Sequence, residues 1–140
     1  MLDTDVLVAA FRSDRGASRQ LLFAALDHSF DLLLSVPLML EYEAVLTRSE
    51  HLEAWGLRME EVALVLDDLA SVARRVRLAF RWRPMLSDAN DDMVLETAVN
   101  GDANAIVTFN HRDFEKASQE FHCAVIFPRQ ALGEIRESNT

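Results

Sequence analysis

The stretch LDTDVLVAA, residues 2–10, places two carboxylates, Asp3 and Asp5, directly before a run of apolar residues. Val6, Leu7 and Val8 follow one another without a polar interruption, which is typical of a short buried strand. The segment therefore predicts a strand that runs into a loop, with Asp3 at or near the end of that strand.

Downstream of this segment, apolar residues recur at helical and at strand spacing in turn. Ser18 is a plausible N-cap for the first predicted helix, and Pro37 suits the first turn of the second. Helices are predicted over residues 18–26, 37–47, 62–72, 91–100 and 128–136. Strands are predicted over residues 31–35, 76–81, 105–108 and 124–127, and connecting segments over residues 51–57, 84–89 and 109–114.

Strands separated by helices predict an α/β fold, and specifically a three-layer α/β/α sandwich with a mostly parallel central sheet. In such sheets, ligands bind beyond the carboxyl ends of the strands, so the loops after Asp3, Ser35 and Thr108 are expected to converge. The length of 140 residues, without an internal repeat or linker, predicts a single domain spanning residues 1–140.

The chain is acidic, with 14 basic against 23 acidic residues and a net charge of −9. This charge disfavours a general basic surface, so any contact with a phosphate backbone must be local or bridged by cations. Cys123 is the single cysteine, no stretch resembles a secretion signal, and the apolar runs fall far short of the roughly 20 residues of a membrane span. These features predict a cytoplasmic protein that makes no membrane contact.

Four groups of acidic or amide side chains adjoin predicted strand ends or helix starts. The groups are Asp3 with Asp5, Glu41 with Glu43, Asp88 with Asp91 and Asp92, and Asn110 with Asp113. Clustered carboxylates repel one another, and a cation removes that cost; hard oxygen ligands suit Mg²⁺, or alternatively Mn²⁺. One or two such ions can promote attack of water on a phosphodiester without a His or Cys nucleophile.

These motifs together resemble a PIN domain over nearly the whole chain. Residues 2–10 resemble the opening motif of that family, and Leu34-Ser35 followed by residues 38–46 with Glu41 resembles its second acidic site. Residues 91–98 resemble the third acidic site, and residues 106–114 resemble the fourth. The chain is most similar to the PIN-type toxins of bacterial toxin–antitoxin pairs.

This resemblance implies a magnesium-dependent endoribonuclease with an RNA substrate. It implies a catalytic set of Asp3, Glu41, Asp91 and Asp113, and metal ligands drawn from Asp3, Glu41, Asp91, Asp92, Asn110 and Asp113. It also implies a homodimer and a small antitoxin protein that neutralises the nuclease.

Two positions depart from the PIN pattern. Asp5 stands where the family usually has Asn, which adds a negative charge beside the expected metal. Asn110 stands where many members carry Asp, and Asp113 is the alternative contributor three residues later. Because a carboxylate binds a hard cation more strongly than an amide, Asp113 is favoured as the fourth ligand.

Several of these residues also have simpler interpretations. Asp91 can be an N-cap and Asp92 a first-turn acid, and helical geometry alone does not choose which of the two faces the site. Glu43 lies two positions from Glu41, so it is predicted to face solvent. Thr4, Asp5 and Thr108 form a second tier of candidates, which either orient ligands and water or only satisfy nearby backbone groups.

Two other functions fit parts of the pattern. Asp3-x-Asp5 followed by Asp88 to Asp92 is similar to the layout of a magnesium phosphatase with an aspartyl nucleophile, although the single lysine, Lys116, has no clear strand-end context for holding phosphate. A catalytically inactive PIN-like binding module is the non-enzyme alternative, and the complete set of acids speaks against it.

Overall fold

The computed structural model describes residues 1–78 and 89–138, except the side chains of residues 89–92, 116 and 117. Its helices are α1 (Thr4–Arg12), α2 (Ala17–Leu26), α3 (Val36–Leu46), α4 (Ser49–Trp55), α5 (Met59–Val72), α6 (Ala89–Asn100), α7 (His111–Phe121) and α8 (Pro128–Ser138). Its strands are β1 (Leu33–Leu34), β2 (Arg74–Arg75), β3 (Ala105–Val107) and β4 (Ala124–Ile126).

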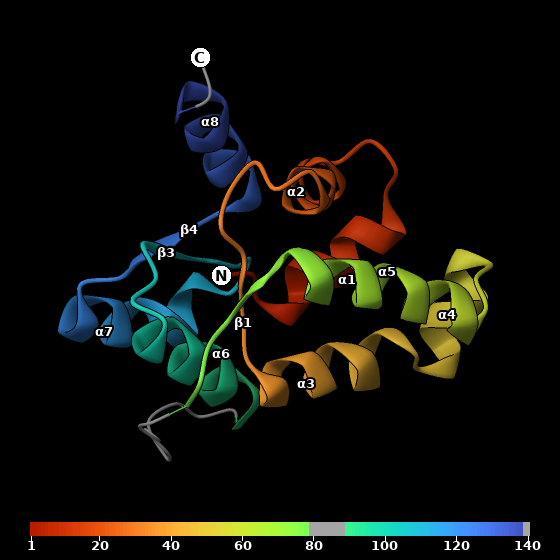
Figure 1. Ribbon diagram of the computed structural model, residues 1–140, viewed down its shortest axis with the longest axis horizontal. Coiled ribbons are helices and arrows are strands. Elements are labelled where there is room, and N and C mark those ends of the chain that lie inside the picture. The colour runs from red at the N-terminus through yellow and green to blue at the C-terminus, as the bar shows by residue number, and fades with distance from the viewer. Residues whose placement is uncertain (79–88, 139–140) are drawn as a thin grey trace.

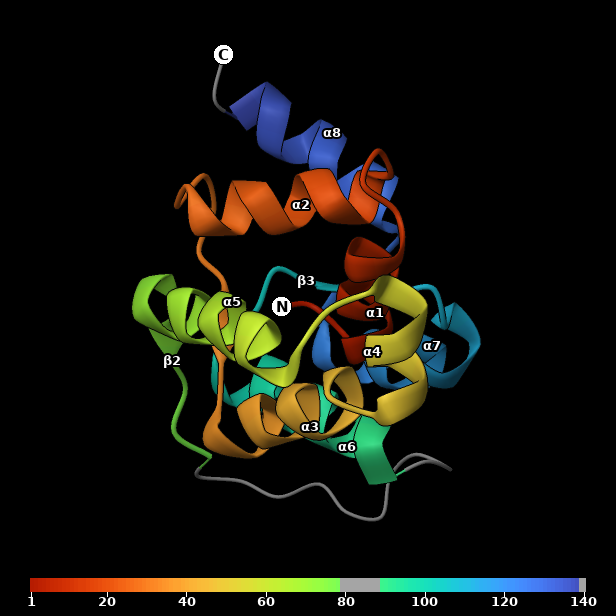
Figure 2. The ribbon, with the colours of Figure 1, turned by 90° about the vertical axis from the view of Figure 1, so that its right-hand side faces the viewer.

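Helices lie on both sides of the short strands. Helices α2 and α8 contact each other on one side, and α3 and α6 contact each other on the opposite side (Figures 1 and 2). Strand β1 pairs in parallel with β2, and β3 pairs in parallel with β4. The α/β class and the parallel pairing agree with the sequence prediction. Within the described residues the strands form two separate pairs, so the three-layer sandwich with one continuous sheet stays a prediction.

The N-terminal segment is the largest departure from the sequence prediction. Residues 4–12 form helix α1, and only Leu2 takes part in pairing, through an isolated parallel bridge to Val107. Asp3 begins the helix as its N-cap, because its carboxylate accepts a hydrogen bond from the Thr4 N–H at 2.8 Å. The helix is apolar on most of its surface and is largely buried, so its apolar run looked like that of a buried strand.

Other boundaries also differ from the prediction. The predicted connector 51–57 is mostly helix α4, and the N-cap of α2 is Gly16 rather than Ser18. The strand expected at residues 76–81 is not seen in its described part, residues 76–78, and residues 79–81 lie outside the described residues. The strand of this region, β2, lies directly before it, where Arg74 N and Val76 N donate hydrogen bonds to Leu32 O and Leu34 O. The predicted loop 84–89 also falls mostly outside the described residues, and the loop after β3 is shorter than expected because α7 already begins at His111.

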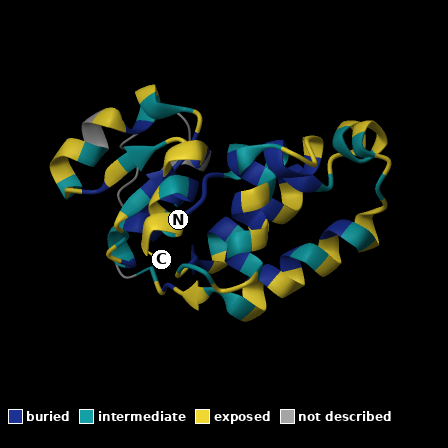
Figure 3. Cartoon of the chain, turned by 90° about the horizontal axis from the view of Figure 1, so that it is seen from above, coloured by how far each residue is buried: buried dark blue, intermediate teal, exposed yellow. Residues whose placement is uncertain are grey.

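Helices α3 and α6 follow the prediction closely and are joined by a buried polar contact. Ser35 is the N-cap of α3, where its hydroxyl accepts from Leu38 N at 3.3 Å, and Pro37 lies in the first turn. The Ser35 and Thr97 hydroxyl oxygens lie 2.6 Å apart, and Thr97 donates to Met93 O within α6. Figure 3 shows that the helices turn buried faces inward and exposed faces outward. The hydrogen bond between Ser35 and Thr97 therefore fixes the start of α3 relative to α6.

Gly101, which follows α6, offers a test of how tightly this region is packed. A Cβ atom there would lie 2.8 Å from both Leu33 Cδ1 and Val76 Cγ2. We therefore expect Gly101→Ala to lower the free energy of unfolding by about 1–3 kcal/mol in urea titrations. Gly133→Ala is the matched control, because no atom lies within 4 Å of its added Cβ and alanine favours a helix by about 0.5–1 kcal/mol. Equal stability of Gly101→Ala and the wild type would contradict this packing.

Candidate active site

Asp3 lies at the centre of the candidate site and is buried, with 7% of its surface exposed. The parallel pairing of Leu2 with Val107 brings Asp3 beside Thr108, which is 105 residues away in the sequence. The Thr108 hydroxyl donates to Asp3 Oδ2 at 2.8 Å, and the Thr4 N–H donates to Oδ1 at 2.8 Å. Both carboxylate oxygens of Asp3 are therefore fixed by hydrogen bonds, at a helix N-terminus that favours a negative charge.

Asp5 joins the same cluster from the first turn of α1. Its Oδ2 atom accepts a hydrogen bond from the Phe109 N–H at 3.1 Å and lies 3.3 Å from the Thr108 hydroxyl. Its Oδ1 atom is buried and has no hydrogen-bond partner among the described residues. The structure therefore gives Asp5 a more central place than the sequence indicated.

The electrostatics of this pair are unfavourable without a counter-charge. Burial, followed by the negative charge of Asp3, raises the pKa of Asp5 to about 7, although hydrogen bonds from Phe109 N–H and the Thr108 hydroxyl oppose the shift. A buried carboxylate oxygen without a partner is the kind of ligand that a divalent cation requires. The Asp3 and Asp5 pair thus fits a hard metal ion.

Thr108 organises this cluster through one fully buried hydroxyl. The hydroxyl oxygen accepts a hydrogen bond from Asn110 N at 2.9 Å, which leaves its proton for the carboxylates. The sequence left two roles open for Thr108, orienting a ligand or satisfying a backbone group. Its hydroxyl makes both kinds of contact, one with the Asp3 carboxylate and one with the Asn110 N–H.

Asn110 and Asp113, the two alternatives for the fourth ligand, lie together at the start of α7. The Asn110 side-chain amide donates to Asp113 Oδ2 at 2.6 Å, and Asn110 contacts Thr108 through its backbone. The pair is connected to the Asp3 cluster through the hydrogen bond from Asn110 N to Thr108, and the choice between the two residues stays open.

Helix α3 reaches the cluster through Tyr42, the neighbour of the predicted ligand Glu41. The buried Tyr42 hydroxyl donates a hydrogen bond to Leu2 O. Burial, and after it the negative charges of Asp3 and Asp5, raise the pKa of Tyr42 well above its usual value. Glu41 is half-buried and Glu43 is exposed, as expected for Glu43. The role of Glu41 as a ligand stays a prediction.

Helix α6 carries the predicted third acidic site, but the side chains of Asp91 and Asp92 lie outside the described residues, as does the whole of Asp88. The same helix contains Glu96, whose side chain is 1% exposed. Glu96 is not among the predicted site residues, although its spacing of four from Asp92 puts the two positions on one face of a helix. Among side chains that the structure describes, no group of three His, Cys, Asp or Glu residues is close enough to hold a metal ion.

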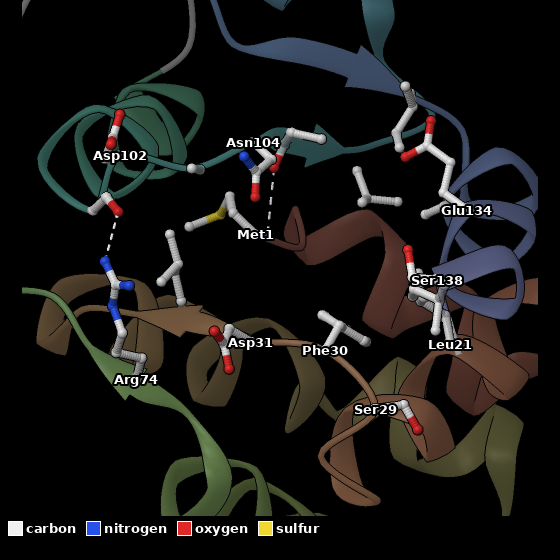
Figure 4. A pocket seen from close by; sticks show the side chains of 18 residues that line it. Met1, Leu21, Ser29, Phe30, Asp31, Arg74, Asp102, Asn104, Glu134 and Ser138 are labelled. Carbon is white, nitrogen blue, oxygen red and sulfur yellow. Dashed lines mark hydrogen bonds between the residues drawn. The ribbon is translucent and has the colours of Figure 1, made fainter. Parts of the chain in front are cut away.

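A separate cavity of about 380 Å³ lies between the two strand pairs, on the side from which the strands start (Figure 4). Its carboxylates, Asp31, Asp102 and Glu134, lie around the cavity without converging on one point (Figure 4). Arg74 is the one arginine among the described residues that line it, and its guanidinium donates a hydrogen bond to the carbonyl oxygen of Gly101 at 2.8 Å. This cavity lacks the paired carboxylates of the Asp3 cluster, so it is a weaker candidate for the active site.

Comparison with known proteins agrees with the resemblance seen in the motifs. Residues 1–112 match the family model of the PIN domain, which covers most of the chain and includes the Asp3 cluster. No curated protein and no solved structure matches the chain. In the described residues, no helix is long and apolar enough to cross a membrane. PIN domains are generally nucleases and typically use divalent metal ions. With four fifths of its length matched, this chain belongs to the PIN domain family.

Proposed function

We propose that this protein is a magnesium-dependent endoribonuclease that cleaves RNA phosphodiesters at the Asp3 cluster. The observation that carries the proposal is the pair of buried Asp3 and half-buried Asp5, which share the Thr108 hydroxyl while the buried Oδ1 atom of Asp5 has no hydrogen-bond partner in the described structure. A family of nucleases and a carboxylate pair suited to a hard cation point to the same chemistry.

The ligands in this proposal come from four segments. Asp3, Glu41, Asp91 and Asp113 are the main set, with Asp92 and Asn110 as the alternatives on the same helices and Asp5 as a further contributor. When bound there, Mg²⁺ or Mn²⁺ supplies Lewis acidity toward the phosphodiester. Thr108 holds Asp3 in one orientation, and Asp3 is fixed a second time by the start of α1. The protein thus keeps its carboxylates in place before a substrate arrives.

Metal dependence tests the proposal directly. We expect the purified protein to cleave single-stranded RNA in Mg²⁺ and to lose that activity in excess EDTA, with recovery when Mg²⁺ or Mn²⁺ is restored. Gel analysis of labelled RNA and DNA of the same sequence measures the cleavage and its preference. Cleavage that persists in EDTA would contradict the metal role, and a phosphorylated Asp3 would indicate a phosphatase instead. Metal-independent RNA binding without cleavage would indicate an inactive binding module.

The proposal extends to the toxin role and its partners. We infer a homodimer that a small antitoxin, encoded by the adjacent gene, neutralises by inserting a basic side chain into the acidic cluster. Light scattering of the protein alone, and of the protein expressed with the neighbouring gene product, tests this inference. A monomer that does not bind that product would contradict it.

The proposal also treats residues 1–140 as one domain with a three-layer sandwich fold. It also includes a cytoplasmic setting, with which the free buried thiol of Cys123 is consistent.

A further inference from the structure

A groove of about 470 Å³ runs beside the Asp3 cluster and has no assigned role. It is formed by the side of α1, the start of α2, the residue after Thr108 and the start of α8. The groove and the cluster share Phe109, which lines the groove while its backbone N–H donates to Asp5. The groove therefore adjoins the candidate active site through Phe109.

Helix α1 runs from the Asp3 cluster along the side of the groove. Asp5, Ala9 and Arg12 are four and seven positions apart, so they lie on one face of the helix. Ala9 and Arg12 line the groove, and the rise of a helix puts Arg12 about 10 Å from Asp5 along the axis. A ligand in the groove extends away from the carboxylates along α1.

The groove presents two aromatic rings to solvent. Phe109 is 49% exposed and Phe127 is 45% exposed, whereas Phe11 and Phe114 are buried in the core. The ring of His111 stacks on Phe127, with the centroids 3.7 Å apart and the planes within 20°. Exposed rings beside a polar site serve as platforms on which nucleic-acid bases stack, because every base has a π-face.

Positive charge accompanies these rings. Arg12 and Arg129 line the groove and are both exposed. Neither forms an ion pair with any other residue in the described ranges, although the chain has a net charge of −9. Guanidinium groups at this place complement the phosphates of a strand whose bases contact the rings.

Resting on the proposed nuclease function, we infer that this groove binds single-stranded RNA next to the cleaved bond. One or two bases stack on Phe109 and Phe127, and the adjoining phosphates contact Arg12 and Arg129. A duplex is excluded because its bases are already stacked on one another and do not offer a free face. The groove thereby selects unpaired segments and places the phosphodiester beside Asp3 and Asp5.

The test measures binding separately from cleavage. Fluorescence anisotropy of a labelled six-nucleotide RNA is recorded in EDTA, where no cleavage is expected. Phe109→Ala and Phe127→Ala should each weaken binding roughly tenfold, the typical effect of losing one stacked base. Arg129→Ala should reduce the slope of log affinity against log salt by about 0.7. Phe23→Ala and Arg48→Ala, which alter exposed residues outside the groove, are the matched controls and should stay within twofold of the wild type.

The possible outcomes separate this inference from the proposed function. Unchanged binding in both phenylalanine variants, or equal affinity for a duplex of the same sequence, would overturn the groove assignment even if the wild type cleaves RNA. Weakened binding in these variants supports the assignment, and it does so even if the wild type cleaves nothing in Mg²⁺, in which case only the proposed function fails.

Discussion

Asp3→Asn should abolish RNA cleavage, with a loss of about a hundredfold or more in the single-turnover rate constant. The substitution removes one negative charge from the pair that we propose to hold the metal, and removing one preorganised electrostatic group from an active site typically costs about 10² to 10³ in rate. The asparagine oxygen can still accept from Thr4 N–H, and the Thr108 proton can turn to Asp5 Oδ2, which lies 3.3 Å away. The fold should therefore be retained.

A second measurement on this variant reports on the metal without relying on activity. Added Mg²⁺ should raise the melting temperature of the wild type, because a ligand that binds only the folded state stabilises it. The same addition should leave the melting temperature of Asp3→Asn nearly unchanged. Without metal, the variant should be at least as stable as the wild type, because the charge that contributes to the raised pKa of Asp5 is gone.

Glu43→Gln is the control for this experiment. It makes the same change from carboxylate to amide, but Glu43 is exposed on α3. Its cleavage rate and its response to Mg²⁺ should match those of the wild type. Cleavage by Asp3→Asn at the rate of Glu43→Gln would remove Asp3 from the catalytic set.

The parts of the fold that the sequence predicted well are those set by local chemistry. Helix α3 was predicted because Ser35 and Pro37 mark its start, and both act there as expected. Helix α6 was predicted from an apolar periodicity that ends at Gly101, and strand β3 from the apolar run Ala105 to Val107. The prediction for the N-terminal segment was wrong. Residues Val6 to Val8 favour a strand by propensity, whereas the Asp3 cap and burial against the core favour a helix.

The candidate site shows the same division between local and distant effects. The sequence pointed to Asp3, Asn110, Asp113 and, as a second-tier residue, Thr108. The contact between Asp3 and Thr108 depends on the register that pairs Leu2 with Val107. A shift of one residue would turn Thr108 to the other face, and no local pattern fixes that register. The place of Asp5 in the cluster also depends on a distant contact, since its hydrogen bond from Phe109 N–H spans the chain.

Thr108→Val tests whether this distant contact matters for function. The change keeps the shape of the side chain but removes a fully buried hydroxyl that donates to Asp3 Oδ2 and accepts from Asn110 N–H. Buried polar groups that lose their partners cost about 1–3 kcal/mol each, so we expect a loss of roughly 2–4 kcal/mol in the free energy of unfolding by urea. Cleavage should fall about 10-fold to 100-fold, the usual effect of removing a group that orients a metal ligand.

Thr108→Ser separates the hydroxyl from the packing of the methyl group. Serine restores the donor to Asp3 and the acceptor for Asn110, and it loses only a buried methyl, at a cost of about 1 kcal/mol. Its cleavage rate should therefore stay near that of the wild type even though its stability falls. If valine and serine variants cleave equally well at a temperature where both are folded, Thr108 only packs. If only serine remains active, the hydroxyl positions Asp3 for catalysis, and the register of the Leu2 bridge becomes a requirement for activity as well as for the fold.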